Sequence, residues 1–367
     1  MKIAIRDTYR QAGCRGGIGY YTIFLAEALS KIVEEVDVYT AEPDIFPGCR
    51  VVGDESIFNC SRLRRGIRLL NKMVCPDIDS SDYACIIFPH LMEPLVHTAK
   101  AKRVVVVYDL ISLLTQRSSL RSIFYYLHYR YNVGRILSEV DKIVTLSEST
   151  KNDLLRNYHL EESRIQVIPS GFNYRLASFR SENDRDRTSL QKTFGDYVLY
   201  IGNSLPHKNL KRLIQAISLV REHIDINLLL VGSNETRAYR NVIKQCGLKS
   251  SVKFLGVVSE DQLAKFLCEA RALVQPSLYE GFGLTPLEAM INGVPVAVSR
   301  CSSLPEVCGQ AAVYFDPLDV QNMAKTIENV LTNAEVRRQC REKGFAQAKK
   351  FEWSMTARKY VEMISAL

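Results

Sequence analysis

The sequence predicts an α/β protein with two doubly wound parallel sheets, each in its own domain. Three observations support this fold class. Short apolar runs alternate with longer stretches of helical periodicity, and the runs lack the polar alternation of half-exposed strands. The alternation stops in a charged stretch at 174–195 and then starts again. Finally, 367 residues are about twice the usual length of one domain.

The predicted elements follow the same order in both halves. In the first half we predict strands at 3–6, 36–40, 84–88, 103–108, 142–146 and 166–168, with helices near 18–33, 119–138 and 149–157. In the second half we predict strands at 197–201, 227–231, 251–255, 272–276, 294–299 and 312–315, with helices near 208–222, 235–246, 260–268, 285–291 and 319–332. Doubly wound sheets bind ligands at the carboxyl ends of their strands, so two such domains predict a cleft between them.

The composition is that of an ordinary globular protein. Apolar residues make up 47% and charged residues 24% of the chain, and no apolar run reaches the length of a membrane span. The chain starts with a strand-like run instead of a signal peptide, so we expect it in the cytoplasm. Its ten cysteines are scattered singly without zinc-ligand spacing, so we expect reduced thiols and no metal site.

The net charge of +8 favours anionic partners. Two stretches of the first half, 56–76 and 110–138, carry basic residues and no acid, and the second also contains several tyrosines. Mixed basic and aromatic residues on a helix predict an interfacial helix on an anionic membrane surface. A helix buried on one side, with solvated arginines on the other, remains the alternative. No nucleic-acid-binding motif accompanies these stretches, and we expect no nucleic acid partner.

The segment 278–289 carries the clearest chemistry. A predicted strand leads into a loop with Gly281 and Gly283, and the loop leads into a helix. Such a loop lets backbone N–H groups and the helix dipole bind a diphosphate, while Glu280 can accept bonds from sugar hydroxyls. The same residues also allow a purely structural interpretation. Thr285 as N-cap, with Glu288 three residues later, would form a capping box.

Several motifs together resemble the retaining GT-B glycosyltransferases of family GT4. The two glutamates lie eight positions apart and precede Gly-Val-Pro-Val at 293–296 and Ser-Ser-Leu-Pro-Glu-Val at 302–307. Five further segments match other motifs of that family: 16–19, 147–150, 167–171, 202–209 and 351–360. The resemblance implies two Rossmann-like domains that face a central cleft. We place the acceptor-binding domain at 1–174, the donor-binding domain at 175–351, and a closing helix at 352–367 that packs back on the first domain.

The resemblance also implies roles on the donor side. It assigns Glu288 to the donor ribose, Glu280 to the hexose and Lys208 to the diphosphate. The residues Gly281, Phe282, Gly283 and Leu284 would line the sugar–diphosphate path, and Gly16 and Gly17 would form a tight loop beneath the phosphates. Many relatives have an arginine where this chain has Asn203, so charge neutralisation would depend more on Lys208. A solvated lysine at a helix start is the alternative for Lys208.

On the acceptor side, relatives often have His-Asp where this chain has Tyr108-Asp109. The match makes Asp109 a third catalytic candidate beside Glu280 and Lys208, in contact with the acceptor or the donor sugar. A helix cap is the alternative for Asp109. His90 also follows a predicted strand, where it would either contact the acceptor or have a structural role.

These motifs look most like those of mannosyltransferases in bacterial surface polysaccharide synthesis. The resemblance implies hexose transfer with retention, from GDP-mannose to a lipid-linked oligosaccharide at the inner face of the cell membrane, without a metal or cofactor. Because no second carboxylate offers itself as a nucleophile, we favour front-face transfer. The alternatives are a UDP-sugar-dependent enzyme with a soluble acceptor and an epimerase-like GT-B enzyme.

Overall fold

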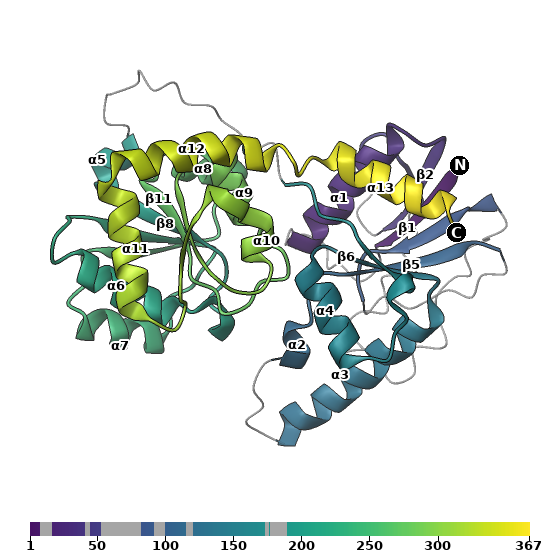
Figure 1. Ribbon diagram of the computed structural model, residues 1–367, viewed down its shortest axis with the longest axis horizontal. Coiled ribbons are helices and arrows are strands. Elements are labelled where there is room, and N and C mark those ends of the chain that lie inside the picture. Colours follow the sequence, from purple (N-terminus) through teal and green to yellow (C-terminus); the bar gives the residue numbers. More distant parts are fainter. Residues whose placement is uncertain are drawn as a thin grey trace. The chain divides into compact units, whose positions relative to one another are not determined.

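The structure, a computed structural model, describes residues 1–7, 17–40, 45–52, 82–91, 100–114, 120–172, 176 and 189–367. The chain forms two compact units (Figure 1). Unit 1 consists of Met1–Gly171 and Glu352–Leu367, and unit 2 consists of Phe172–Phe351. Each unit contains one parallel sheet with helices packed against it, so the predicted fold class is confirmed.

Unit 1 has a seven-stranded sheet in the order β3-β2-β1-β4-β5-β6-β7, and every neighbouring pair is parallel. Its strands are β1 (Lys2–Asp7), β2 (Glu35–Thr40), β3 (Arg50–Val52), β4 (Cys85–Phe88), β5 (Lys102–Val107), β6 (Lys142–Thr145) and β7 (Ile165–Val167). Its helices are α1 (Gly17–Ser30), α2 (Ile111–Leu114), α3 (Leu120–Glu139), α4 (Glu148–Asn157), the short 3-10 turn η5 (Glu162–Arg164) and α13 (Trp353–Ser365). The strand order reverses between β1 and β4, which makes this the switch point of the sheet.

The last helix of the chain completes unit 1. Helix α13 packs against α1 (Figure 1), and the hydroxyls of Tyr21 and Tyr360 are 2.8 Å apart in the buried contact between these helices. Trp353 packs edge-on against Tyr21, with ring centroids 5.2 Å apart. Its indole also covers Gly171, where a Cβ atom would lie only 2.6 Å from the ring. A side chain at position 171 would therefore displace the indole.

Unit 2 has a six-stranded parallel sheet in the order β10-β9-β8-β11-β12-β13. Its strands are β8 (Tyr197–Ile201), β9 (Asn227–Val231), β10 (Val252–Gly256), β11 (Ala272–Gln275), β12 (Val296–Ser299) and β13 (Val313–Phe315). Its helices are α5 (Ser189–Phe194), α6 (Leu210–Val220), α7 (Arg237–Gln245), α8 (Glu260–Glu269), α9 (Leu284–Ile291), α10 (Leu304–Cys308), α11 (Val320–Thr332) and α12 (Ala334–Ala348), with the 3-10 turns η7 (Pro206–Lys208) and η8 (Gly309–Ala311). The strand order reverses between β8 and β11, so the loops that follow these two strands flank the switch point.

Candidate functional site

Two loops of unit 2 bring a lysine and a glutamate together. Lys208 ends the 3-10 turn η7 in the loop after β8, and Glu280 lies in the loop between β11 and α9. The Lys208 Nζ atom is 2.7 Å from Oε1 and 2.9 Å from Oε2 of Glu280. Because both loops leave the sheet at its switch point, residues 72 positions apart in sequence form one half-buried ion pair.

The loop that carries Lys208 is fixed by its neighbour. Asn209 adopts a left-handed conformation, with φ of 60°, and is buried. Its Nδ2 atom donates to the carbonyl oxygens of Pro276, at 3.0 Å, and Pro317, at 2.8 Å. The backbone N–H of Leu278 in turn donates to the carbonyl of His207 at 2.7 Å. These bonds tie the two loops together and hold Lys208 beside Glu280.

The two carboxylate oxygens of Glu280 differ in the number of hydrogen bonds that they accept. Oε1 accepts bonds from Lys208, from Gln275 Nε2 at 2.6 Å and from Ser277 Oγ at 2.6 Å. Among the described residues, Oε2 accepts only the bond from Lys208. Burial raises the pKa of this carboxyl, but Lys208 and the two hydrogen bonds lower it by more, so the pKa lies below its ordinary value. Glu280 is therefore ionised at neutral pH, and Oε2 retains capacity for a further donor.

A third loop supports the backbone around Glu280. The N–H of Glu280 donates to Ser302 Oγ at 2.8 Å. The Ser303 hydroxyl lies 2.9 Å from the carbonyl oxygen of Glu280 and 2.7 Å from that of Phe282. The Ser-Ser pair of the 302–307 motif thus acts through the backbone, by fixing the loop that carries Glu280.

Helix α9 starts without the predicted capping box. It begins at Leu284, its N-cap is Gly283 with φ of 110°, and no side chain caps it. Thr285 lies inside the first turn, where its Oγ1 is 3.4 Å from Gln275 Oε1. The prediction of Thr285 as N-cap was wrong because the glycine takes the backbone conformation that ends the loop one residue before the helix. Glu288 therefore does not form a capping box with Thr285.

Glu288 is a buried carboxyl on the second turn of α9. Within the part of the chain that the structure describes, no group donates a hydrogen bond to its carboxyl; only its backbone carbonyl accepts one, from Asn292. Burial, with a smaller contribution from the charge of Glu260, raises its pKa to about 7. An 8% exposed carboxyl without a donor is disfavoured unless a hydroxyl or similar group binds to it.

Asn203 has a local role in the loop after β8. Its Oδ1 accepts the backbone N–H of Leu205 at 3.1 Å, which forms a turn, and its side chain is exposed. The preceding residue, Gly202, has φ of 151°, and a Cβ there would lie 2.5 Å from the hydroxyl of Tyr200. Position 202 therefore has no room for a side chain beside Tyr200.

The acceptor candidates lie in unit 1, each after the end of a strand. Asp109 Oδ1 accepts the N–H of Ile111 at 2.9 Å at the start of α2, which is the capping role that the sequence left open. Tyr108 packs edge-on against Tyr21, with ring centroids 5.2 Å apart. Burial lowers the pKa of His90 to about 4, so its ring is neutral at neutral pH.

Two glycines of unit 1 were predicted to lie beneath the donor phosphates. Gly16 lies outside the described residues, and Gly17 is the first residue of α1.

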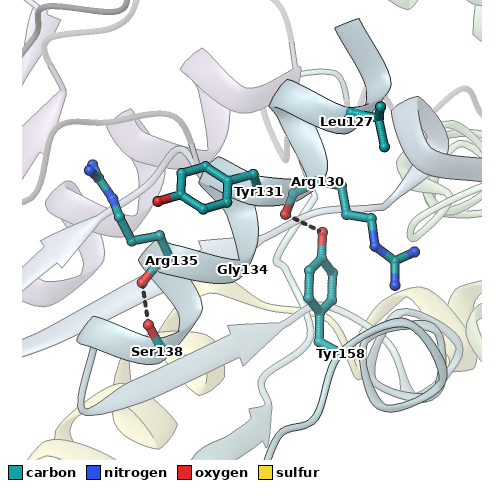
Figure 2. Close-up of a pocket in the computed structure, with 7 residues that line it drawn as sticks. All are labelled: Leu127, Arg130, Tyr131, Gly134, Arg135, Ser138 and Tyr158. Atoms are coloured by element: carbon teal, nitrogen blue, oxygen red, sulfur yellow. Dashed lines mark hydrogen bonds between the residues drawn. The ribbon is translucent and has the colours of Figure 1, made fainter. Parts of the chain in front are cut away.

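Helix α3 and the end of α4 enclose a shallow hollow of about 560 Å³ on the surface of unit 1 (Figure 2). Its lining residues are Leu127, Arg130, Tyr131, Gly134, Arg135, Ser138 and Tyr158. Leu127 is 55% and Tyr131 70% exposed, so two apolar side chains face solvent beside two arginines. The other basic stretch, 56–76, lies outside the described residues. None of the described helices is long and apolar enough to cross a bilayer.

Two family models match the chain. The model of glycosyl transferases group 1 matches residues 182–347, and the model of glycosyltransferase family 4 matches residues 15–175. Together they cover most of the sequence. The chain therefore belongs to this family of glycosyltransferases, and the resemblance drawn from its motifs is confirmed.

Two of the individual relatives are mannosyltransferases of Escherichia coli. O-antigen chain mannosyltransferase B of Escherichia coli is 31% identical over 59% of this chain and 58% of its own length. Serotype-specific mannosyltransferase WbdA of Escherichia coli is 28% identical over 72% of this chain and 34% of its own length. The chain thus spans less than two thirds of each. Among solved structures, sucrose-phosphate synthase from Thermosynechococcus elongatus superposes over 100% of both chains, with a TM-score of 0.75 and 20% identity, and shares the fold.

Sequence reasoning missed two side chains that hold Glu280. Gln275 is the last residue of β11, and Ser277 follows it by two positions. Both are buried, and both donate to Oε1 of Glu280. A polar residue at the end of an otherwise apolar strand is the signal that would have pointed to Gln275, because an uncompensated amide is rarely buried.

Proposed function

We propose that the protein transfers a hexose, with retention, from a nucleotide sugar to a hydroxyl of a lipid-linked oligosaccharide in bacterial surface polysaccharide synthesis. GDP-mannose is the donor that we favour. The observation that carries the proposal is the Lys208–Glu280 pair at the switch point of unit 2. The family membership supports transfer, and the names of the Escherichia coli relatives support mannose.

The donor would bind to unit 2. An ammonium group has three N–H donors, and Lys208 directs two contacts at Glu280, so the third remains for a diphosphate oxygen. The N-terminal end of α9, with Gly281, Phe282, Gly283 and Leu284 leading into it, adds a favourable dipole for that diphosphate. Oε2 of Glu280 would accept a hexose hydroxyl.

Glu288 would bind the donor ribose. Its carboxyl receives no hydrogen bond from the described residues, and two ribose hydroxyls could donate to its two oxygens. Hydrogen bonds from the bound ribose would stabilise the ionised form of this carboxyl, whose pKa burial raises in their absence. Asn203 is already used in a local turn, so we assign the neutralisation of the diphosphate mainly to Lys208.

Transfer would proceed on one face of the sugar. The bond from the anomeric carbon to the diphosphate oxygen breaks, the acceptor oxygen forms its bond on the same face, and the departing phosphate takes the acceptor proton. Negative charge grows on that phosphate in the transition state, where Lys208 and the α9 dipole stabilise it most. We propose that no metal is needed, because these groups supply the positive charge.

The acceptor would bind to unit 1, where His90, Tyr108 and Asp109 follow strands of the sheet. We assign the hollow on α3 to the anionic surface of the cell membrane, because exposed Leu127 and Tyr131 lie beside Arg130 and Arg135 (Figure 2). Apolar and basic side chains on one face of a helix favour an anionic bilayer. The protein would then associate peripherally with the inner face of that membrane.

A panel of nucleotide sugars tests the proposal. We expect GDP-mannose to raise the melting temperature of the protein more than GDP, UDP-glucose or ADP-glucose, since a ligand at a hundred times its Kd stabilises by about 2.7 kcal/mol. Turnover of the bound donor should require a lipid-linked acceptor. A preference for a UDP-sugar and a soluble acceptor would instead indicate a UDP-sugar-dependent enzyme of that kind. Conversion of the donor without any acceptor would indicate an epimerase-like enzyme.

A further inference from the structure

Strand β1 of unit 1 contains a buried arginine. Arg6 is only 2% exposed, and its Nη1 atom is inaccessible and has no hydrogen-bond partner. Within the described part of the chain, the guanidinium of Arg6 makes no hydrogen bond or ion pair. Arginine is rarely buried without a partner, because its guanidinium always carries a charge and loses its hydration. Among the described residues, this side chain therefore lacks the anion that its environment requires.

The acid on the neighbouring strand cannot supply that anion. Asp37 of β2 lies on the same face of the sheet, since it pairs in register with Ala4 and Tyr39 pairs with Arg6. However, Asp37 accepts a hydrogen bond from Tyr83 and forms ion pairs with Lys2, at 3.4 Å, and Arg50, at 3.6 Å. Oδ1 of Asp37 is buried without a hydrogen-bond partner, but no ion pair joins this carboxyl to Arg6 in the described part of the chain, so Arg6 needs a different partner.

Arg6 lies where a doubly wound sheet binds ligands. It is the penultimate residue of β1, at the carboxyl edge of the sheet, and β1 and β4 form the switch point. Two buried hydroxyls at this edge have no hydrogen-bond partner in the described part of the chain: that of Tyr108 after β5 and that of Thr145 in β6. The carboxyl of Asp7, the last residue of β1, is also buried there, but Asp7 follows Arg6 directly in the strand, so its side chain points to the opposite face of the sheet. The hydroxyls of Tyr108 and Thr145 can bind the neutral hydroxyls of a sugar, and Arg6 adds a positive charge at this edge.

We propose that Arg6 binds an anionic group, a phosphate or a carboxylate, carried by the sugar that unit 1 accepts. The planar guanidinium can donate two parallel hydrogen bonds to either group. That this anion belongs to the acceptor rests on the proposed function, because unit 2 would bind the donor. The acceptor is thus an acidic or phosphorylated glycan, and Arg6 selects it over a neutral one.

The test uses the full chain and simple anions. Melting temperatures are measured at constant ionic strength with inorganic phosphate, mannose 6-phosphate, glucuronate or uncharged mannose. We expect an increase with the anions and none with mannose alone. A response to mannose 6-phosphate only would assign the site to phosphate, and a response to glucuronate only would assign it to carboxylate. No response to any anion would overturn the proposal.

Two variants of Arg6 decide whether the response arises at this residue. Without anions, Arg6→Met should raise the melting temperature by about 3 °C, because an unpaired buried charge is replaced by an apolar chain. It should also weaken anion binding at least tenfold. Arg6→Gln, which is polar, uncharged and shorter, provides the same binding test if the methionine variant does not fold. Arg156→Met removes an exposed arginine of the same unit and should change neither property.

Two results would contradict the assignment: an unchanged anion response in both Arg6 variants, or a lower melting temperature of Arg6→Met together with an intact response. Binding of GDP-mannose, measured in the same samples, separates this proposal from the proposed function. Arg6→Met should bind that nucleotide sugar as the unmodified protein does. If no nucleotide sugar binds to either, the proposed function fails while the anion measurements still test Arg6.

Discussion

At the scale of single residues, the candidate site depends on two carboxyls with opposite surroundings. Glu280 receives hydrogen bonds from Lys208, Gln275 and Ser277, which keep it ionised. Glu288 has no donor to its carboxyl among the described residues, and burial, together with the charge of Glu260, raises its pKa to about 7. The first arrangement suits a fixed negative charge that holds Lys208 in place, and the second suits a group that gains its partners from a ligand.

Removing either member of the ion pair should reduce transfer strongly. We expect Lys208→Ala and Glu280→Ala each to lower kcat by about a hundredfold or more, since one preorganised charge in a transition state contributes about 3 kcal/mol. Steady-state kinetics with the preferred donor gives this value. Lys211→Ala removes an exposed lysine of neighbouring α6 and should leave kcat unchanged. Near-normal turnover in either site variant, with the fold intact by circular dichroism, would refute the assignment.

Glu288 should make stability depend on pH. Its folded pKa, about 7, exceeds the ordinary value of 4.5, so its ionisation destabilises the fold as pH rises through this interval. We therefore expect Glu288→Gln to raise the free energy of unfolding at pH 8 by up to about 3 kcal/mol, and to have little effect at pH 4. Urea unfolding at both pH values measures the difference. Equal effects at pH 4 and pH 8 would contradict the raised pKa.

At the scale of elements, strand ends and loops decide which side chains meet. The loops after β8 and β11 are joined by Asn209 and by the bond from Leu278 to His207, so Lys208 and Glu280 have little freedom to separate. Helix α3 differs, because its hollowed surface carries exposed apolar and basic residues that no described element covers. The loops after β8 and β11 thus form an internal site, whereas α3 offers an exposed surface for a binding partner.

Membrane binding through α3 is open to a direct test. We expect the protein to float with vesicles that contain phosphatidylglycerol, and less with neutral vesicles. Leu127→Glu and Tyr131→Glu together should abolish flotation, because they place acids in the exposed apolar part of the hollow. The exposed Lys211, on α6, is a control site for the same substitution. Flotation that survives the double change would show that α3 is not the binding surface.

At the scale of the whole molecule, the end of the chain stabilises its beginning. Helix α13 returns to unit 1, where Tyr360 meets Tyr21 and Trp353 covers Gly171. The last sixteen residues belong to the first compact unit and not to the one that precedes them in sequence. The integrity of the sheet that carries Arg6 therefore depends on residues more than 330 positions away.

A methyl group at Gly171 should disturb this packing. Because its Cβ would lie 2.6 Å from the Trp353 ring, we expect Gly171→Ala to lower the free energy of unfolding by about 1–3 kcal/mol. Gly134→Ala in α3 is the control, since its Cβ would meet Tyr158 at an ordinary 3.4 Å and helix propensity favours alanine. Urea unfolding followed by tryptophan fluorescence compares them, and equal stability of the two variants would argue against the close contact.

The sequence by itself determined the alternation of strands and helices and the glycine-rich loop before α9, because periodicity and turn residues act over a few positions. It did not predict β3, a three-residue strand at the edge of the sheet, or the start of α9 at Leu284, which depends on the backbone conformation of Gly283. Only the tertiary structure decided that Lys208 pairs with Glu280, that Gln275 supports Glu280, and that Arg6 is buried without a counter-ion among the described residues. The order of strands in a sheet sets such contacts, and local sequence patterns carry no record of that order.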